Sequence, residues 1–303
     1  MTKQPLYIGL DAGGSKTTMV AGYSLSDAPM RREGPCANLQ RQGLDATADV
    51  LAALIRQAMQ AYPGSAEVSV CAGVAGAGDD VEQDALAETV CGLLDREAPR
   101  HLRIVHDAAI ALEGAFEGGS GIIVIAGTGS ICLASTTGGD MLRAGGWGYL
   151  LGDEGSGHAL GLAGLRAIAL AFDDGPSTRL SSLLADRYGI DTPRALVHQV
   201  YQKKWPVQQM APLVVQAAEE GDDVAQALIR EQTGLLARQV AGMIQRREAI
   251  TPRVALLGGL NKEPFYKQAL VSALLAVLPA WTVQEPTAPP VFGALQLAMK
   301  NTD

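Results

Sequence analysis

Residues 6–23 read LYIGLDAGGSKTTMVAGY: a short apolar run, a glycine turn, and a second run of β-branched and apolar residues. This pattern predicts two strands, Leu6–Leu10 and Thr17–Tyr23, which the turn joins as a hairpin. Glycine lets backbone N–H groups approach a phosphate closely, and the hydroxyls of Ser15 and Thr17 add hydrogen-bond donors. The turn is therefore either a phosphate-binding loop or an ordinary hairpin turn, and on its own it favours neither.

A second hairpin of the same kind follows at residues 121–135, GIIVIAGTGSICLAS, with its glycine turn at residues 127–130. A later strand that ends in small residues also occurs twice, as VSVCAG at 68–73 and VALLGG at 254–259. This weak internal repeat indicates two related halves. Two glycine turns at related positions favour phosphate binding, with one turn on each side of the β- and γ-phosphates.

Neither turn matches the common nucleotide-binding motifs. The GxxxxGK[ST] spacing of a Walker A loop does not occur here, and neither turn fits GxGxxG followed by a helix. Asp11, at the end of the first predicted strand, is placed to hold Mg²⁺ through water, because hard cations prefer oxygen ligands.

The composition narrows the class of protein. A chain of 303 residues, 48% hydrophobic and 18% charged, predicts two domains with a sizeable core. A net charge of −8 argues against nucleic acid or an anionic membrane as the main partner. The four cysteines lack the spacing of a zinc site or a disulfide framework, and the apolar stretches are too short to span a bilayer. We therefore expect a cytoplasmic protein.

Strands and helices alternate along the chain, which predicts an α/β protein with helices covering sheets. Further strands are expected at 30–35, 68–71, 102–105, 121–126, 131–135 and 254–257. Helices are expected at 45–62, 81–94, 158–172, 178–188, 192–201, 222–246, 264–278 and 291–300.

Asp107 follows the apolar run at 102–105 and precedes a predicted helix that runs to Phe116. Ligand sites in α/β proteins gather at the carboxyl ends of strands, so a carboxylate here is placed to orient and deprotonate an attacking hydroxyl. The alternative is that Asp107 is the N-cap of that helix, and position alone favours the cap.

Glycine is also dense at residues 145–148 and 152–157. Asp153 in the second segment is a candidate acceptor for sugar hydroxyls, whereas Trp147 in the first is better explained as a core anchor than as a ring stacked on a ligand. Residues 257–261, LGGLN, suit either a flat adenosine against bare backbone or a tight strand-to-helix connection. The four histidines show no metal-ligand spacing and have no assigned role.

Five segments, DAGGSKTT, HDA, GTGS, GGWGYLLGDEGSG and LLGGLNKE, occur in this order. Together they resemble the BadF/BadG/BcrA/BcrD-type ATPases of the actin, Hsp70 and sugar-kinase superfamily, over residues 6 to 300. The resemblance is greatest to the N-acetylglucosamine and glucosamine kinases. It implies an α/β fold of two ribonuclease-H-like (actin-like ATPase) domains, with mixed sheets flanked by helices and ATP in the cleft between the domains. The expected domains are 1–108 and 109–289, the second with a helical insertion, and the last helix, about 290–303, packs back on the first.

The resemblance also implies roles for individual residues. Asp107 matches the catalytic base, and Asp11 holds Mg²⁺ through water. The implied nucleotide-binding residues are Asp11, Gly13, Gly14, Ser15, Lys16, Thr17, Gly127, Thr128, Gly129, Gly258 and Gly259. The implied amino-sugar-binding residues are Asn38, Asp107, Ser130, Gly145, Gly146, Trp147 and Asp153. Ala12 and Ser15 stand where Gly and Thr are frequent in the family, and neither change removes a backbone donor or the hydroxyl.

The activity that the resemblance implies is transfer of the γ-phosphoryl group of MgATP to the 6-hydroxyl of an amino sugar, by a protein that forms a homodimer. N-acetylglucosamine leads glucosamine as the expected substrate. One rival is an ATP-driven activator of an acyl-CoA dehydratase, but such proteins hold an iron–sulfur cluster with paired cysteines, and Cys132 has no second cysteine near it in the carboxyl half. Another is a sugar-binding regulator without catalysis, and the acidic charge argues against DNA binding.

Overall fold

The computed structural model describes residues 4–25, 29–245 and 249–300. The chain divides into two compact units: unit 1 is Met1–Gly119 with Pro286–Asp303, and unit 2 is Ser120–Glu285. Unit 1 extends beyond the boundary expected at residue 108. The physical reason is that α4 (Asp107–Phe116) packs on α11 (Pro290–Lys300) and on the strands of unit 1.

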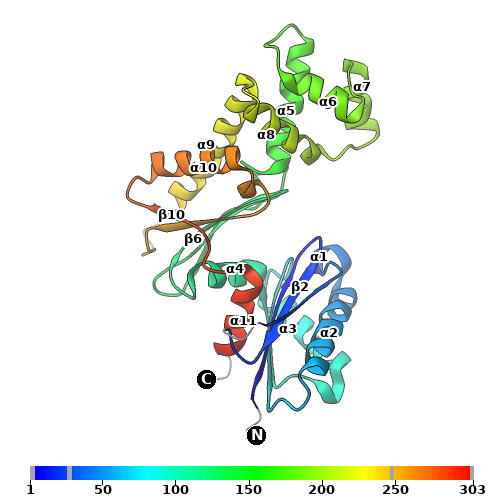
Figure 1. Ribbon diagram of the computed structural model, residues 1–303, viewed down its shortest axis with the longest axis vertical. Helices are drawn as coiled ribbons and strands as arrows, with labels where there is room; N and C mark the ends of the chain where they lie inside the picture. Colours follow the sequence, from blue (N-terminus) through cyan, green and yellow to red (C-terminus); the bar gives the residue numbers. More distant parts are fainter. Residues whose placement is uncertain (1–3, 26–28, 246–248, 301–303) are drawn as a thin grey trace. The chain divides into compact units, whose positions relative to one another are not determined.

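Unit 1 is built on a mixed five-stranded sheet in the order β3-β2-β1-β4-β5 (Figure 1). The hairpin strands β1 and β2 are antiparallel, as are β2 and β3, whereas β1, β4 and β5 run parallel. The bounds of these strands are β1 Leu6–Ala12, β2 Thr17–Gly22, β3 Met30–Gly34, β4 Val68–Val74 and β5 His101–His106. The carboxyl ends of β1, β4 and β5 therefore meet at one edge of the sheet.

Helices cover both faces of this sheet (Figure 1). Leu6, Ile8 and Leu10 alternate along β1 and pack in one core with α2 (Leu44–Ala61) and α3 (Asp80–Leu94). The other face packs on α4 and α11. Among the described residues, this unit also has the single turn α1 (Leu39–Gln42) and a 3₁₀ turn at Asp95–Glu97.

Unit 2 repeats this sheet. Its strand order is β10-β9-β6-β7-β8. Strand β7 is antiparallel to both β6 and β8, whereas β6, β9 and β10 run parallel. The bounds are β6 Gly121–Ala126, β7 Ser130–Ser135, β8 Met141–Gly145, β9 Arg253–Leu257 and β10 Thr282–Gln284. Strands β6, β7 and β9 thus occupy the places of β1, β2 and β4, which confirms the two correspondences that the sequence suggested.

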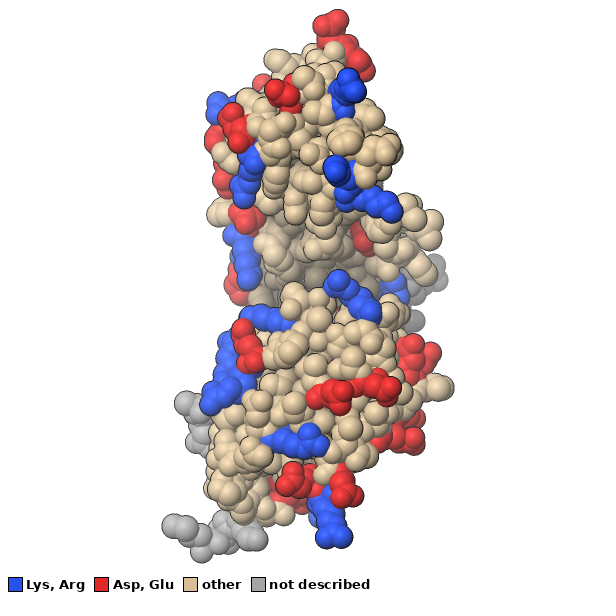
Figure 2. All heavy atoms as spheres, turned by 90° about the vertical axis from the view of Figure 1, so that its right-hand side faces the viewer, with Lys and Arg blue, Asp and Glu red and all other residues tan. Residues whose placement is uncertain are grey.

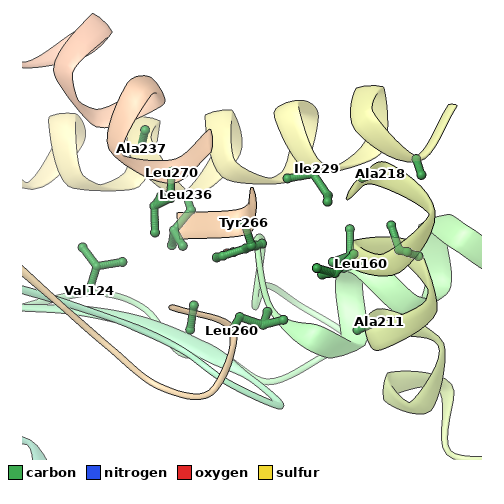
Figure 3. Close-up of a cluster of buried hydrophobic side chains, with 14 of the residues drawn as sticks. Val124, Leu160, Ala211, Ala218, Ile229, Leu236, Ala237, Leu260, Tyr266 and Leu270 are labelled. Carbon is green, nitrogen blue, oxygen red and sulfur yellow. The ribbon is translucent and has the colours of Figure 1, made fainter. Parts of the chain in front are cut away.

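The stretch between β8 and β9 is helical. Its helices are α5 Gly157–Phe172, α6 Arg179–Tyr188, α7 Pro193–Val197, α8 Ala211–Glu219 and α9 Asp223–Ile244, and α10 Pro264–Val277 follows β9. Tyr266 lies fully buried in the core that joins these helices to the sheet, among Leu160, Leu236 and Leu270 (Figure 3). The helix expected at 192–201 is α7 followed by a turn of π-helix, and α8 was not expected.

The sequence also failed to predict β8 and β10, the two edge strands of unit 2. β8 alternates between exposed and partly covered residues up to the buried Gly145, and β10 has three residues, none of them fully buried. Neither strand carries the continuous apolar run of a buried strand. None of the described helices is long and apolar enough to cross a membrane.

Candidate functional site

The turn between β1 and β2 presents backbone donors to solvent. Gly13 N donates to Lys16 O at 3.2 Å and closes the turn, while Gly14, Ser15 and Lys16 are exposed. Within the described part of the chain, the N–H groups of Gly14 and Ser15 have no protein partner. The Thr17 hydroxyl is buried without a hydrogen-bond partner among the described residues. Unused donors beside an exposed turn suit a phosphate, whose oxygens accept hydrogen bonds.

Lys16 is already engaged by a neighbouring carboxylate. Its Nζ lies 2.6 Å from Glu33 Oε1, and both side chains are about half exposed. An exposed pair of this kind contributes little to stability. A phosphate therefore competes with Glu33 for Lys16 at small cost.

Asp11 lies in β1 opposite Thr18, at the edge where the parallel strands end, and Asp107 is the first residue of α4, directly after β5. Burial, and after it the charge of Asp107, raise the pKa of Asp11 to about 6, although the charge of Lys16 lowers it. Two carboxylates that repel each other in a partly buried place favour a hard cation, which takes oxygen ligands and reduces the repulsion. Among the described residues no three His, Cys, Asp or Glu side chains group as a metal site, so Mg²⁺ here would need phosphate oxygens and water as further ligands.

His106, to which the sequence assigned no role, is the N-cap of α4. Its Nδ1 accepts a hydrogen bond from Ala108 N at 3.1 Å, and the same atom lies 2.9 Å from Asp107 Oδ1. The alternative interpretation of Asp107 as the cap is therefore wrong. Because the cap is His106, the Asp107 carboxylate is not used by the helix, and its side chain is 41% exposed.

Asn38 caps α1, and its Oδ1 accepts a hydrogen bond from Arg41 N at 3.1 Å. Arg41, which the sequence did not single out, reaches back to the first turn, and its Nη1 donates to Gly14 O at 3.0 Å. A cation therefore lies beside the exposed turn. Nothing in the sequence pattern indicates this contact, since 27 residues separate its two partners.

The second glycine turn lies against the start of α5. Gly157 N donates to Gly127 O at 2.7 Å, and His158 N donates to Thr128 O at 3.1 Å. Helix α5 is capped by Ser156, and helix N-termini favour anions. The turn and this helix end together form the expected surroundings of a phosphate.

Asp153 lies beside the same turn. Its backbone has a φ of 63°, its side chain is buried, and a Cβ on Gly129 would lie 2.8 Å from its Oδ2. Ser130 donates its hydroxyl to Glu154 O at 2.7 Å. The structure thus brings Gly127, Gly129, Ser130 and Asp153 together within unit 2.

A pocket of about 500 Å³ opens next to this turn. It is lined by Gly127, Thr128, Gly157, Gln208, Ala211, Pro212, Val215, Gly259, Leu260 and Glu263. Gly258 has a φ of 98°, and a Cβ there would lie 2.2 Å from Ala126 O, whereas a Cβ on Gly259 would meet nothing within 4 Å. Gly258 is needed for a tight connection, and Gly259 leaves open backbone at the pocket wall. A largely apolar pocket beside the second glycine turn fits a nucleoside.

The segment from Gly145 to Gly157 carries exposed aromatic surface. Gly145 and Gly146 have φ values of 71° and 68°. Trp147 is 67% exposed, so its interpretation as a core anchor is wrong. The Arg143 guanidinium lies over its ring, 5.0 Å from the centroid. The ring is therefore held in place from one side and open to a ligand.

Helix α9 supports this segment with two glutamines that the sequence did not indicate. Gln239 Nε2 donates to Glu154 Oε2, and a Cβ on Gly145 would lie 2.5 Å from Gln239 Oε1. Two turns earlier, Gln232 Oε1 accepts from Gly155 N at 3.2 Å. The two glutamines lie seven residues apart on a helix that carries several other polar residues, so no pattern in the sequence singles them out.

On the face shown in Figure 2, basic and acidic side chains are interspersed. The broad basic surface typical of nucleic-acid-binding proteins is absent from the described residues of that view.

Two mixed sheets of the same strand order, each with a glycine turn after its first strand, define the actin-like fold of ATPases and sugar kinases. The chain belongs to the BadF/BadG/BcrA/BcrD ATPase family, whose model matches residues 8–298. Both expectations from the sequence, the fold and the family, are confirmed.

Individual relatives are similar over nearly the whole chain. The N-acetyl-D-glucosamine kinase of Dictyostelium discoideum is 28% identical over 99% of each chain. The N-acetylmuramic acid/N-acetylglucosamine kinase of Clostridium acetobutylicum is 32% identical over 78% of this chain and 79% of the relative. A solved structure from Chromobacterium violaceum, named as a candidate N-acetylglucosamine kinase, has a TM-score of 0.72 and 27% identity, and covers 97% of this chain and 99% of that one.

Proposed function

We propose that this protein is an ATP-dependent kinase that phosphorylates the 6-hydroxyl of N-acetylglucosamine. The observation that carries the proposal is the carboxylate of Asp107, which does not cap α4 and lies at the end of β5, at the same sheet edge as Asp11. The two relatives named as N-acetylglucosamine kinases, similar over most of the chain, support the choice of sugar. Glucosamine is the second candidate substrate.

Asp107 acts as the general base of this reaction. It accepts the proton of the sugar 6-hydroxyl as the oxygen attacks the γ-phosphorus, and it holds that oxygen in line. Phosphoryl transfer proceeds through a loose transition state, so positioning and charge neutralisation supply most of the rate enhancement. A carboxylate that no helix cap consumes is free for this task.

Each unit contributes residues that we assign to nucleotide binding. The pocket with Gly258 and Gly259 takes the adenosine, and the turns at Gly13–Thr17 and Gly127–Gly129 donate backbone N–H groups to the phosphates. Lys16 and Arg41 add positive charge beside the first turn. The unused donors of Gly14, Ser15 and Thr17 support this assignment.

Asp11 holds Mg²⁺ through water in this proposal. When bound, Mg²⁺ would neutralise charge on the phosphates. The repulsion between Asp11 and Asp107 and the raised pKa of Asp11 support the assignment, because a bound cation would reduce the repulsion and favour the ionised carboxylate.

The amino sugar is held by Asn38, Ser130, Gly145, Gly146, Trp147 and Asp153. The buried Asp153 carboxylate accepts hydrogen bonds from sugar hydroxyls, and the exposed Trp147 ring offers an apolar face. Ser130 already donates its hydroxyl to Glu154 O, so its oxygen is left to accept from the sugar. We also propose a homodimer, as the family resemblance implies, and a cytoplasmic location, where ATP is supplied.

The rival assignment as an activator of an acyl-CoA dehydratase needs a thiolate that can hold an iron–sulfur cluster. Cys132 is fully buried, and burial raises the pKa of its thiol to about 12. A thiol so disfavoured as a thiolate, inside the unit 2 core, does not suit a cluster at a dimer interface. The iron content and colour of the purified protein test the rival directly.

The proposed function is tested by coupled ATP turnover with glucosamine, N-acetylglucosamine, N-acetylmannosamine, muramic acid and glucose. We expect the highest kcat/KM with N-acetylglucosamine and loss of turnover when EDTA removes Mg²⁺. A higher kcat/KM with glucosamine would make glucosamine the substrate in place of N-acetylglucosamine. The absence of sugar-dependent turnover with the whole panel would defeat the kinase assignment.

A further inference from the structure

Asp153 adopts an unfavourable state in the loop before α5. Its φ of 63° lies in the left-handed region, its side chain is 8% exposed, and a Cβ on Gly129 would lie 2.8 Å from its Oδ2. Among the described residues its carboxylate has no hydrogen-bond or ion-pair partner. A left-handed backbone and a buried carboxylate without a partner both oppose folding, so Asp153 keeps this state only if its neighbours hold it.

Side chains from three elements fix the backbone of the next two residues. Glu154 O accepts from the hydroxyl of Ser130 in β7 at 2.7 Å. Gly155 N donates to Oε1 of Gln232 in α9 at 3.2 Å, and Gly155 O accepts from the hydroxyl of Tyr266 in α10. Tyr266 is fully buried (Figure 3), so its hydroxyl has no solvent to turn to. These bonds determine the direction of the peptide groups that follow the left-handed residue.

We propose that Gln232 and Tyr266 are positioning residues, which hold Asp153 in the geometry in which it binds the amino sugar. This inference rests on the proposed kinase function. Both residues act through the backbone of Gly155 and not by contact with the sugar. A carboxylate that is already in place binds hydroxyls without ordering of the loop, so loss of either bond weakens sugar binding.

The second glycine turn is tied to α5 by bonds of its own. Gly157 N donates to Gly127 O at 2.7 Å, and His158 N donates to Thr128 O at 3.1 Å. Neither bond involves α9 or α10. We therefore expect loss of the bonds at Gly155 to affect the sugar and to leave the KM for ATP nearly unchanged.

Three substitutions test the two bonds. Gln232→Met keeps the size of the side chain and removes the acceptor, Gln232→Glu keeps an acceptor oxygen, and Tyr266→Phe removes only the hydroxyl. We expect Gln232→Met and Tyr266→Phe to raise the Kd of N-acetylglucosamine about fivefold, the effect of one hydrogen bond, and Gln232→Glu to stay within about twofold of the wild type. Calorimetric titration measures the Kd, and steady-state kinetics measures the KM for ATP.

Two matched controls make the same changes away from the loop. Gln226→Met, also in α9, removes a bond to Ala218 O, and Tyr62→Phe in unit 1 removes a bond to Ala21 O. We expect both controls to lose similar thermal stability and to bind the sugar like the wild type. Sugar binding that weakens equally in controls and test variants, in step with unfolding temperature, would overturn the proposal.

A double-mutant cycle shows whether Gln232 acts through Asp153. Asp153→Gly removes the carboxylate, and glycine adopts the left-handed backbone freely. In this background we expect Gln232→Met to change the Kd of N-acetylglucosamine by less than about twofold. Two effects that multiply in full would show that Gln232 acts independently of Asp153 and would contradict the proposal.

Hydrogen exchange of the Gly155 amide, measured by NMR, reports on the loop without any sugar. We expect exchange about fivefold or more faster in Gln232→Met than in the wild type, and protection retained in Gln232→Glu. Unchanged exchange in Gln232→Met would overturn the proposal. If the wild type binds and phosphorylates none of the sugars, the proposed function fails, and exchange at Gly155 still decides whether Gln232 holds the loop beside Asp153.

Discussion

At the scale of single residues, the surroundings of Asp11 disfavour the ionised form of its carboxyl group. The folded protein raises its pKa from 3.8 to about 6, mainly through burial. A raised pKa means that the folded state binds the proton more tightly than the unfolded state, so the stability contributed by this group is complete below about pH 4 and is lost as pH rises through 6. The free protein therefore becomes less stable over this range on account of Asp11.

Asp11→Asn removes this penalty. We expect the variant to unfold a few degrees above the wild type at pH 8 and at the same temperature near pH 4, while its kinase activity is lost with the proposed Mg²⁺ ligand. Thermal unfolding at the two pH values measures this, with Asp84→Asn on the exposed side of α3 as control. Equal differences at both pH values would show that the charge of Asp11 is not the cause.

Asp107→Asn tests the base itself. The amide has nearly the same shape as the carboxyl but takes no proton at neutral pH, so we expect kcat to fall about 10²-fold or more with sugar binding unchanged. Steady-state kinetics and calorimetric binding of N-acetylglucosamine measure the two quantities. A variant that binds the sugar normally and keeps full turnover would remove Asp107 from the role.

The sequence predicted the position of Asp107 at a strand end because strand ends are read from apolar runs and helix starts. It did not predict that His106 caps α4, that Arg41 reaches Gly14, or that Gln239 supports Gly145. The latter two depend on side chains that meet across distant segments, which no local pattern encodes. His106 was missed because histidine is not among the preferred N-cap residues.

At the scale of elements, the two adjacent glycines after β9, Gly258 and Gly259, have different structural roles. A Cβ on Gly258 would lie 2.2 Å from Ala126 O on the neighbouring strand β6, and its φ of 98° is unfavourable for any other residue. A Cβ on Gly259 would meet nothing within 4 Å and would occupy space at the wall of the proposed nucleotide pocket.

The pair Gly258→Ala and Gly259→Ala exploits this difference. We expect Gly258→Ala to lose about 2 kcal/mol or more of unfolding free energy, because the contact is with backbone and the conformation is strained. Gly259→Ala should unfold like the wild type and raise KM for ATP severalfold. Thermal unfolding and ATP titration measure the two effects. An unchanged KM for ATP in Gly259→Ala would show that the nucleotide does not bind in this pocket.

Strands with continuous apolar runs were predicted well, whereas two of the four edge strands, β8 and β10, were not. Strands β1, β6 and β9 have neighbours on both sides and were found from sequence, whereas β8 and β10 lie at sheet edges with half-exposed residues. Burial, and therefore hydrophobicity, marks a strand in sequence only when the strand is covered.

At the scale of the whole molecule, the chain leaves unit 1 after Gly119 and returns to it at Pro286. The returning helix α11 is part of the unit 1 core: Gly9 in β1 approaches the backbone of Leu295 so closely that a Cβ would lie 2.4 Å from its N atom. Gly293 in α11 approaches Ile110 O of α4 in the same way, at 2.1 Å. Unit 2, in contrast, is one continuous segment with its own core.

This arrangement predicts that the two units depend differently on the carboxyl terminus. Truncation after Glu285 exposes the apolar face of β1 and β4 that α11 covers, so we expect unit 1 to lose its cooperative unfolding transition, while residues 120–285 alone keep theirs. Circular dichroism during thermal unfolding of the full chain, of 1–285 and of 120–285 measures this. Because the contacts at Gly9 and Gly293 are specific to α11, a peptide of residues 286–303 should restore the lost transition in 1–285, and the same peptide with Gly293→Leu should not. A truncated chain that unfolds like the full one would show that α11 only lies on unit 1 and does not complete its core.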